Sequence, residues 1–164
     1  MKTEMKPKIL SREEGDHMWY LGNLSTVKAN AEHTGGQFSL VEDLMAPGYE
    51  TPYHIHRKED ETFYLLEGEM EIILDGRKYQ AKADHFAFLP RNIPHGFRIV
   101  GDRPARMLVM IHPSGFDRFF AELGEPAQRL ELPPQVEPDI PKLLETAKKY
   151  EVEILGPLDL FITE

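Results

Sequence analysis

Cysteine is absent from the 164 residues of this chain. Without thiols the chain has no disulfide framework, no thiolate metal site and no cysteine nucleophile, so any metal ion must be held by nitrogen and oxygen atoms. Long apolar runs are also missing. No stretch approaches the length of a membrane span, and the first residues lack the continuous apolar segment of a secretory signal. We therefore expect a cytoplasmic protein that does not contact membranes.

Positive charge is scarce: 19 basic residues stand against 28 acidic ones, for a net charge of −9. This charge repels phosphate backbones and anionic lipid surfaces, so we expect no nucleic-acid partner. The hydrophobic fraction of 41% and the charged fraction of 29% are those of a globular protein. The length suits one well-buried core with appended segments.

Prolines and glycines separate short apolar stretches over most of the chain, as in FSLVEDLMAPG (38–48) and ARMLVMIH (105–112). Their spacing of roughly ten residues is typical of antiparallel strands in a sandwich or barrel. Asp75 and Gly76 stand between two strand-like runs and predict a tight hairpin turn. We therefore predict an all-β fold up to residue 112.

The pattern changes after Pro113. The segment SGFDRFFAELG (114–124) places phenylalanines at helical spacing, with Ser114 as a candidate N-cap and Gly124 as a candidate stop. After a proline-rich connection, residues 141–155 begin with the pattern of a second amphipathic helix. We expect both helices to cover the barrel or a dimer contact. The expected division is an N-terminal segment (1–16), a barrel (17–112) and a C-terminal helical extension packed on it (113–164).

The stretch GYETPYHIHRKEDETFYLLEG (48–68) carries the chemistry. Side chains two apart on a strand point to the same face, so His54 and His56 project together if TPYHIH is extended. A polar turn separates them from Glu61, which an antiparallel pairing brings within reach. His95, at the start of another strand-like run, is the candidate third imidazole.

This stretch resembles the first motif of the cupin family in its spacing of Gly48, His54, His56, Glu61 and Gly68. The resemblance implies a double-stranded β-helix, or jelly-roll, barrel. It also implies one divalent metal ion, bound by the two histidines, the glutamate and a later histidine.

The second cupin motif is matched in part. Pro90 and the liganding His95 are kept, while the usual glycines and asparagine are replaced by Asp84, Asn92 and Ile99. Asparagine and aspartate tolerate positive φ, so Asp84 and Asn92 can hold the turns that glycine normally forms. The lead-in GGQFSLVEDLMAPG and the helical tail are similar to single-domain quercetin-dioxygenase-like cupins.

Three aromatic residues are candidates for the substrate pocket: Phe63, Phe88 and Phe97. Phe63 shares a strand face with Glu61, and Phe97 shares one with His95. Packing in the barrel core is the alternative role for all three, and strand parity does not choose between the roles.

Three imidazoles and one carboxylate leave an octahedral divalent ion with two open positions, whereas tetrahedral zinc is closed by the same four ligands. The ligand types do not select among Fe, Mn, Ni, Co, Cu and Zn. The resemblance implies a dioxygenase that acts on a flavonol-like or other hydroxylated aromatic or enol. In such a dioxygenase, Glu61 is both a metal ligand and the general base that accepts the substrate proton.

Two other functions remain open: a non-oxidative metal enzyme, such as an isomerase, decarboxylase or lyase, and a small-molecule sensor without catalysis. The resemblance also implies a homodimer. Ile73 in EMEIILDG is the outward-facing residue that we expect at such a contact.

Overall fold

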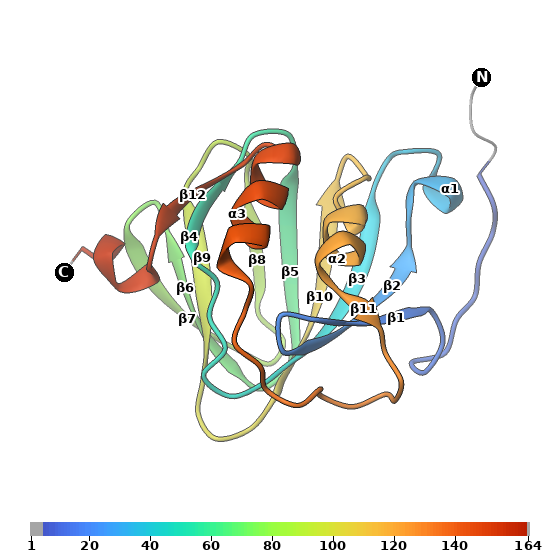
Figure 1. The fold of residues 1–164 in the computed structure, drawn as a ribbon, viewed down its shortest axis with the longest axis horizontal. Helices are drawn as coiled ribbons and strands as arrows, with labels where there is room; N and C mark the ends of the chain where they lie inside the picture. The colour runs from blue at the N-terminus through green and yellow to red at the C-terminus, as the bar shows by residue number, and fades with distance from the viewer. Residues whose placement is uncertain (1–4, 164) are drawn as a thin grey trace.

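The computed structural model describes residues 5–163. These residues form two antiparallel sheets with short helices packed against them (Figure 1). The strands are β1 (Asp16–Tyr20), β2 (Asn23–Ala29), β3 (Ser39–Met45), β4 (Tyr53–His56), β5 (Asp60–Glu67), β6 (Glu69–Leu74), β7 (Arg77–Lys82), β8 (Phe86–Leu89), β9 (His95–Val100), β10 (Ala105–His112), β11 (Glu125–Pro126) and β12 (Val152–Gly156). The helices are α1 (Ala31–Thr34), α2 (Asp117–Leu123), α3 (Ile140–Lys149) and the 3₁₀ turn η1 (Leu158–Phe161).

The seven-stranded sheet has the order β11-β1-β2-β3-β10-β5-β8, and the five-stranded sheet has the order β12-β4-β9-β6-β7. Consecutive side chains along each strand alternate between the interior and the outer face. In β10, for example, Ala105, Met107, Val109 and Ile111 are buried, and the residues between them are partly exposed. This alternation builds an apolar core between the two sheets and confirms the all-β prediction.

The predicted turns have the backbone that the sequence required. Asp75 and Gly76 have φ values of 50° and 77° and join β6 to β7. Asp84 and Asn92 have φ values of 69° and 66°, in the left-handed region that these side chains tolerate. The substitutions in the second motif therefore preserve the turns on either side of β8.

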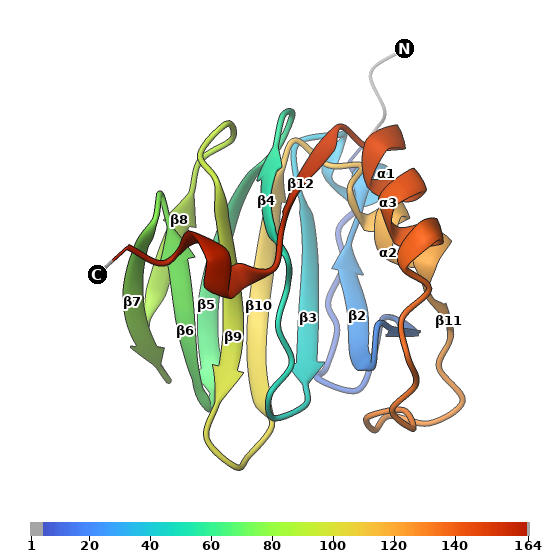
Figure 2. The same cartoon turned by 60° about the vertical axis from the view of Figure 1, so that its left-hand side comes forward.

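The C-terminal tail does more than cover the sheets. Helix α2 packs against β1 and β3, and α3 packs against α2 and β12. Beyond α3 the chain forms β12, which pairs with β4 along the edge of the five-stranded sheet (Figure 2). The short β11 likewise pairs with β1. The sequence predicted only the helices of this tail, and the division at residue 112 stays a prediction.

Two local predictions were wrong. Helix α2 begins at Asp117 rather than after Ser114, because the Asp117 carboxylate accepts hydrogen bonds from Ser39 and from the Gly115 amide and holds this turn. Ile73 lies on the outer face of β6, opposite the core residue Ile72, but it is not exposed there: it is completely buried against Tyr53 and the Leu158 side chain of η1. Among the described residues, no helix has both the length and the apolarity that crossing a membrane requires.

Candidate metal centre

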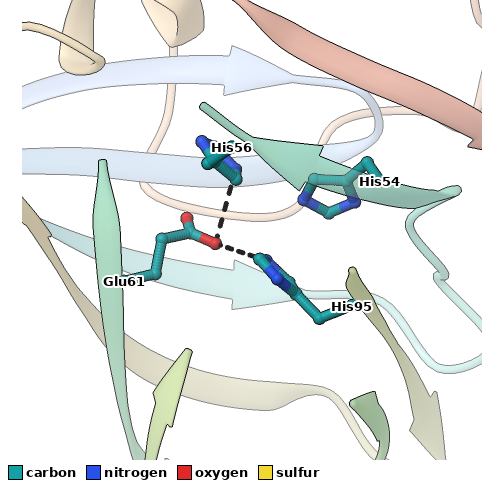
Figure 3. Close-up of side chains that lie close together, drawn as sticks. All are labelled: His54, His56, Glu61 and His95. Carbon is teal, nitrogen blue, oxygen red and sulfur yellow. Dashed lines mark hydrogen bonds and ion pairs between the residues drawn. The ribbon is translucent and has the colours of Figure 1, made fainter. Parts of the chain in front are cut away.

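The predicted ligands meet between the two sheets. His54 and His56 lie on β4, and His95 begins β9, where it pairs directly with His54. Glu61 comes from β5 of the opposite sheet. One ligand atom from each of the four side chains lies within 4.8 Å of the others, as Figure 3 shows. The structure thus brings together residues that the sequence holds up to 41 positions apart.

Glu61 is the centre of this cluster. Its Oε2 atom lies 2.9 Å from Nε2 of His95 and 3.4 Å from Nε2 of His56. Both histidines and the glutamate are at most 6% exposed, whereas His54 is partly exposed. Water therefore has restricted access to the cluster, which strengthens the electrostatic interactions within it.

An oxygen atom faces the outer ring nitrogen of each histidine. Nδ1 of His54 donates to the Pro52 carbonyl at 2.7 Å, and Nδ1 of His95 donates to the Ile93 carbonyl at 3.0 Å. Nδ1 of His56 lies 3.6 Å from the buried carboxylate of Glu59. The two hydrogen bonds fix the tautomer and orientation of His54 and His95, leaving Nε2 of each ring to face the interior.

Charge is distributed unevenly over the cluster. Burial raises the pKa of Glu61, but His56 and His95 outweigh it and hold that pKa at about 2. Burial, together with the neighbouring His95 and His56, lowers the pKa of His54 to about 3. Burial also lowers the pKa of His56, but the carboxylates of Glu61 and Glu59 reverse this and raise it. At neutral pH, Glu61 is therefore ionised and His54 is neutral with a free lone pair.

The ion pair between Asp60 and Arg91 connects the chain next to Glu61 with the turn that precedes His95. The Asp60 carboxylate accepts hydrogen bonds from the backbone amide of Arg91 and from its guanidinium, at 2.8–3.0 Å. The backbone amide of Asn92 donates to the carbonyl of His56 at 2.8 Å. The turn before His95 is thus bound both to β5, beside Glu61, and to β4.

The donor set fits a divalent first-row transition metal. Imidazole nitrogen and carboxylate oxygen are ligands that Fe, Mn, Co, Ni, Cu and Zn all accept. The buried Nδ1 of His56 and Oε2 of Glu59 have no hydrogen-bond partner within the described part of the chain, so His56 is the least restrained imidazole. A bound cation would compensate the negative charge of both carboxylates.

A cavity of about 90 Å³ adjoins the cluster and reaches His54, His56 and Glu61. Phe63 and Phe97 line it, and their role in binding a substrate stays a prediction. Phe88 does not, and its predicted role in the pocket was wrong. It is 51% exposed on the outer face of β8, because Leu89, the next residue, occupies the inward position.

Several lining residues were missed from the sequence. Phe116, Phe119 and Phe120 of the tail form part of the wall, and the ring of Phe116 meets that of His56 edge to face at 4.7 Å. Asp43 and Tyr49 also line the cavity. Asp43 had a usable signal, because it shares the buried face of an alternating strand, SLVEDLM.

Comparison with known proteins agrees with this architecture. The family model described as "Cupin domain" matches residues 41–111. Quercetin 2,3-dioxygenase of Bacillus subtilis is 32% identical over 120 residues, which cover 73% of this chain but 35% of that protein. The protein named polyketide synthase CurC, from Streptomyces cyaneus, is 32% identical over 117 residues, which cover 67% of this chain and 72% of the relative.

Among solved structures, KdgF from a Halomonas species superposes with a TM-score of 0.61 at 18% identity, covering 69% of this chain and 99% of KdgF. At that identity the likeness concerns the fold alone. The two sheets, the matched domain and the sequence relatives lead to one conclusion: this chain belongs to the cupin superfamily.

Proposed function

We propose that His54, His56, Glu61 and His95 bind one divalent metal ion, and that the adjoining cavity binds a small hydroxylated aromatic or enol substrate for reaction with dioxygen. The observation that carries this proposal is the convergence of three imidazoles and one carboxylate within 4.8 Å at the wall of a cavity. The similarity to quercetin 2,3-dioxygenase supports it, although this chain spans 35% of that protein's length.

The metal, when bound, supplies a Lewis acid that lowers the pKa of a substrate hydroxyl or enol and, if redox-active, a site for oxygen chemistry. The chain supplies the base. Oε2 of Glu61 faces His95 and His56, and Oε1 makes no hydrogen bond with any described residue. Oε1 is therefore the carboxylate oxygen that is left to accept the substrate proton.

The cavity selects by size and charge. Its volume of about 90 Å³ is well below the roughly 300–1,000 Å³ of clefts that hold drug-sized molecules. A flavonol therefore requires the aromatic wall of α2 to move, whereas a molecule of one ring fits more readily. No lysine or arginine is found among the described residues that line the cavity, so a neutral substrate is favoured over a carboxylate or phosphate.

A second candidate function is a non-oxidative reaction at the same metal, such as that of an isomerase, a decarboxylase or a lyase. Asp43 favours it, because a second carboxyl in the cavity gives the protein a second group that can carry a proton. The similarity to CurC, which extends over 72% of that protein, agrees with chemistry other than that of a quercetin dioxygenase.

The test begins with metal analysis of freshly purified protein and oxygen uptake with a panel of small phenols, enols and flavonols. We expect one metal ion per chain and oxygen consumption with at least one substrate. Substrate turnover without oxygen uptake would favour the second candidate, and binding without turnover would indicate a sensor. Absence of metal after loading would refute the proposal.

The variant Glu61→Gln tests the base. It should retain part of the metal affinity and lose turnover, because the amide is a much weaker proton acceptor. Glu69→Gln is the matched control, since Glu69 is exposed on β6. Turnover by Glu61→Gln equal to that of the control would refute the assignment of Glu61 as the base.

We also propose a homodimer. Tyr64, Phe86 and Phe88 are 39%, 64% and 51% exposed on the outer face of paired strands β5 and β8. Three exposed rings at a sheet edge favour a contact with another protein surface. Sedimentation velocity should give a dimer that Phe86→Lys weakens. A monomer at all concentrations would refute it.

A further inference from the structure

Asp43 is a buried acid that the proposed metal chemistry does not use. It lies on the inward face of β3, between Val41 and Met45, and is 8% exposed. Within residues 5–163, its carboxylate makes one hydrogen bond, which Ser25 Oγ donates to Oδ1. A carboxylate has capacity for several donors, and a buried one is costly when they are missing. Asp43 also lines the cavity, so Oδ2 is the atom left to meet a ligand.

Two phenol groups accompany Asp43. Tyr20 and Tyr49 line the same cavity. Burial raises the pKa of both phenols, and the charge of Asp43 raises each of them further. Both hydroxyls therefore stay protonated at neutral pH and can donate a hydrogen bond or accept one. Asp43, Tyr20 and Tyr49 together form a second polar region in a cavity that is otherwise largely apolar.

The strand register separates this second polar region from the metal centre. Glu61 pairs with Ile111, and Ile111 pairs with Ser39 on β3. Asp43 lies four residues further along β3, or about 13 Å at the usual rise of a strand. The two carboxylates therefore belong to different layers of the barrel.

One apolar layer lies between them. Val109 on β10 pairs with Val41 on one side and with Phe63 on the other. All three residues point inward and are at most 4% exposed. Val109 and Phe63 line the cavity. A bound molecule that reaches from the metal centre to Asp43 must therefore contact this layer of apolar side chains along its middle part.

We propose that Asp43, Tyr20 and Tyr49 form a second binding point for the substrate, which receives a neutral hydroxyl or carbonyl oxygen. The substrate class is then a small molecule with two oxygen functions joined by an apolar body of about one ring. This inference rests on the proposed function only in placing the other oxygen at the metal.

The competing explanation is structural. The hydrogen bond between Ser25 and Asp43 joins β2 to β3 at residues that already pair in the sheet. In that case the carboxyl has no influence on what the cavity binds. The two explanations differ in ligand preference, which a matched pair of probes measures.

The probes are 4-hydroxybenzyl alcohol and 4-ethylphenol, which have nearly the same shape and differ in that a methyl group of the second replaces the alcohol hydroxyl of the first. Their affinities are measured by isothermal titration calorimetry with the full chain, once loaded with redox-inert Zn²⁺ and once after treatment with EDTA. The wild type should prefer the alcohol by roughly tenfold, the effect of one buried hydrogen bond. The variants are Asp43→Leu, Tyr20→Phe and the control Asp43→Asn.

Asp43→Leu should abolish the preference, and Asp43→Asn should keep part of it, because an amide still donates and accepts. Tyr20→Phe loses a single hydroxyl and serves if Asp43→Leu fails to fold. Reduced preference in either variant supports the inference. The inference is overturned if the wild type binds neither probe or does not discriminate, or if the folded variants discriminate as the wild type does.

The comparison of the Zn²⁺-loaded protein with the EDTA-treated protein distinguishes failure of the proposed metal-dependent function from failure of the second binding point. If the chain binds no Zn²⁺ but the EDTA-treated protein prefers the alcohol, the proposed function fails and the second binding point stands. If Zn²⁺ binds with the expected ligands and no preference is seen, the second binding point fails alone.

Discussion

Nε2 of His95 lies 2.9 Å from Oε2 of Glu61, although 34 positions separate them in the chain and they belong to different sheets. The two imidazoles that flank them come from a third strand. A ligand that binds only the folded protein stabilises it, so loading with a divalent metal should raise the melting temperature. Removal of one liganding side chain should lower the metal affinity by more than the ~100-fold that loss of an outer partner can cause.

The variants for this prediction are His95→Ala and His54→Ala, with His85→Ala as the control on an exposed turn. Calorimetric titration with Zn²⁺ and Mn²⁺ measures the affinity, and circular dichroism reports on folding. Equal affinities in the folded variants and the control would contradict the four-ligand site.

Glu59 should tune the metal without touching it. Its buried carboxylate lies 3.6 Å from Nδ1 of His56, beyond hydrogen-bond distance, and its charge raises the pKa of the ring. We expect Glu59→Gln to lower metal affinity about tenfold. Glu151→Gln is the control, because that carboxylate is about half exposed and pairs with Lys58. Identical titrations for the two variants would show that Glu59 has no part in the site.

Asp43 should make stability depend on pH. Burial raises the pKa of its carboxyl to about 7, although the hydrogen bond from Ser25 opposes the shift. The folded state therefore binds more protons than the unfolded state between about pH 4 and pH 7. The contribution of Asp43 to the free energy of unfolding is fully present below pH 4 and is lost as pH rises through 7.

Urea denaturation of the metal-free protein from pH 4 to pH 8 tests this. The difference in unfolding free energy between Asp43→Asn and the wild type should shift in favour of the variant as pH rises. A constant difference over this range would mean that the carboxyl titrates alike in both states.

Gly96 should tolerate no side chain. A Cβ added there would lie 2.6 Å from Cδ1 of Leu158, 3.0 Å from the Pro52 carbonyl and 3.2 Å from Oγ1 of Thr51. We expect Gly96→Ala to cost about 1–3 kcal/mol of unfolding free energy, as overpacking usually does. Because Gly96 follows His95, the same variant should weaken metal binding.

A double-mutant cycle identifies the cause. In the background of Leu158→Ala the closest clash is absent, so Gly96→Ala should cost less than it does in the wild type. Urea denaturation measures all four proteins. If Gly96→Ala costs the same unfolding free energy in both backgrounds, η1 does not restrict this position.

Local physical constraints made much of the site readable from the sequence. The two-residue spacing of His54 and His56 places both rings on one face of any extended strand. Asp75, Asp84 and Asn92 occupy left-handed backbone because few other side chains tolerate it. Each of these inferences concerns residues close together in the chain, where covalent geometry alone restricts the outcome.

Tertiary structure decided the rest. Alternation showed that Phe86 and Phe88 share a face, but not that Ala87 and Leu89 would point inward and leave both rings outside. Strand β12 pairs with the edge strand β4, although about a hundred residues separate the two strands in the sequence. No local pattern encodes such a contact.

The sequence by itself thus determined the fold family and the four candidate ligands, because motif spacing and strand parity are local properties. Only the folded chain set the size of the cavity and placed Asp43 within it beside Tyr20 and Tyr49. The physical reason is that burial depends on which distant segments pack together, and here the C-terminal tail closes one wall of the cavity.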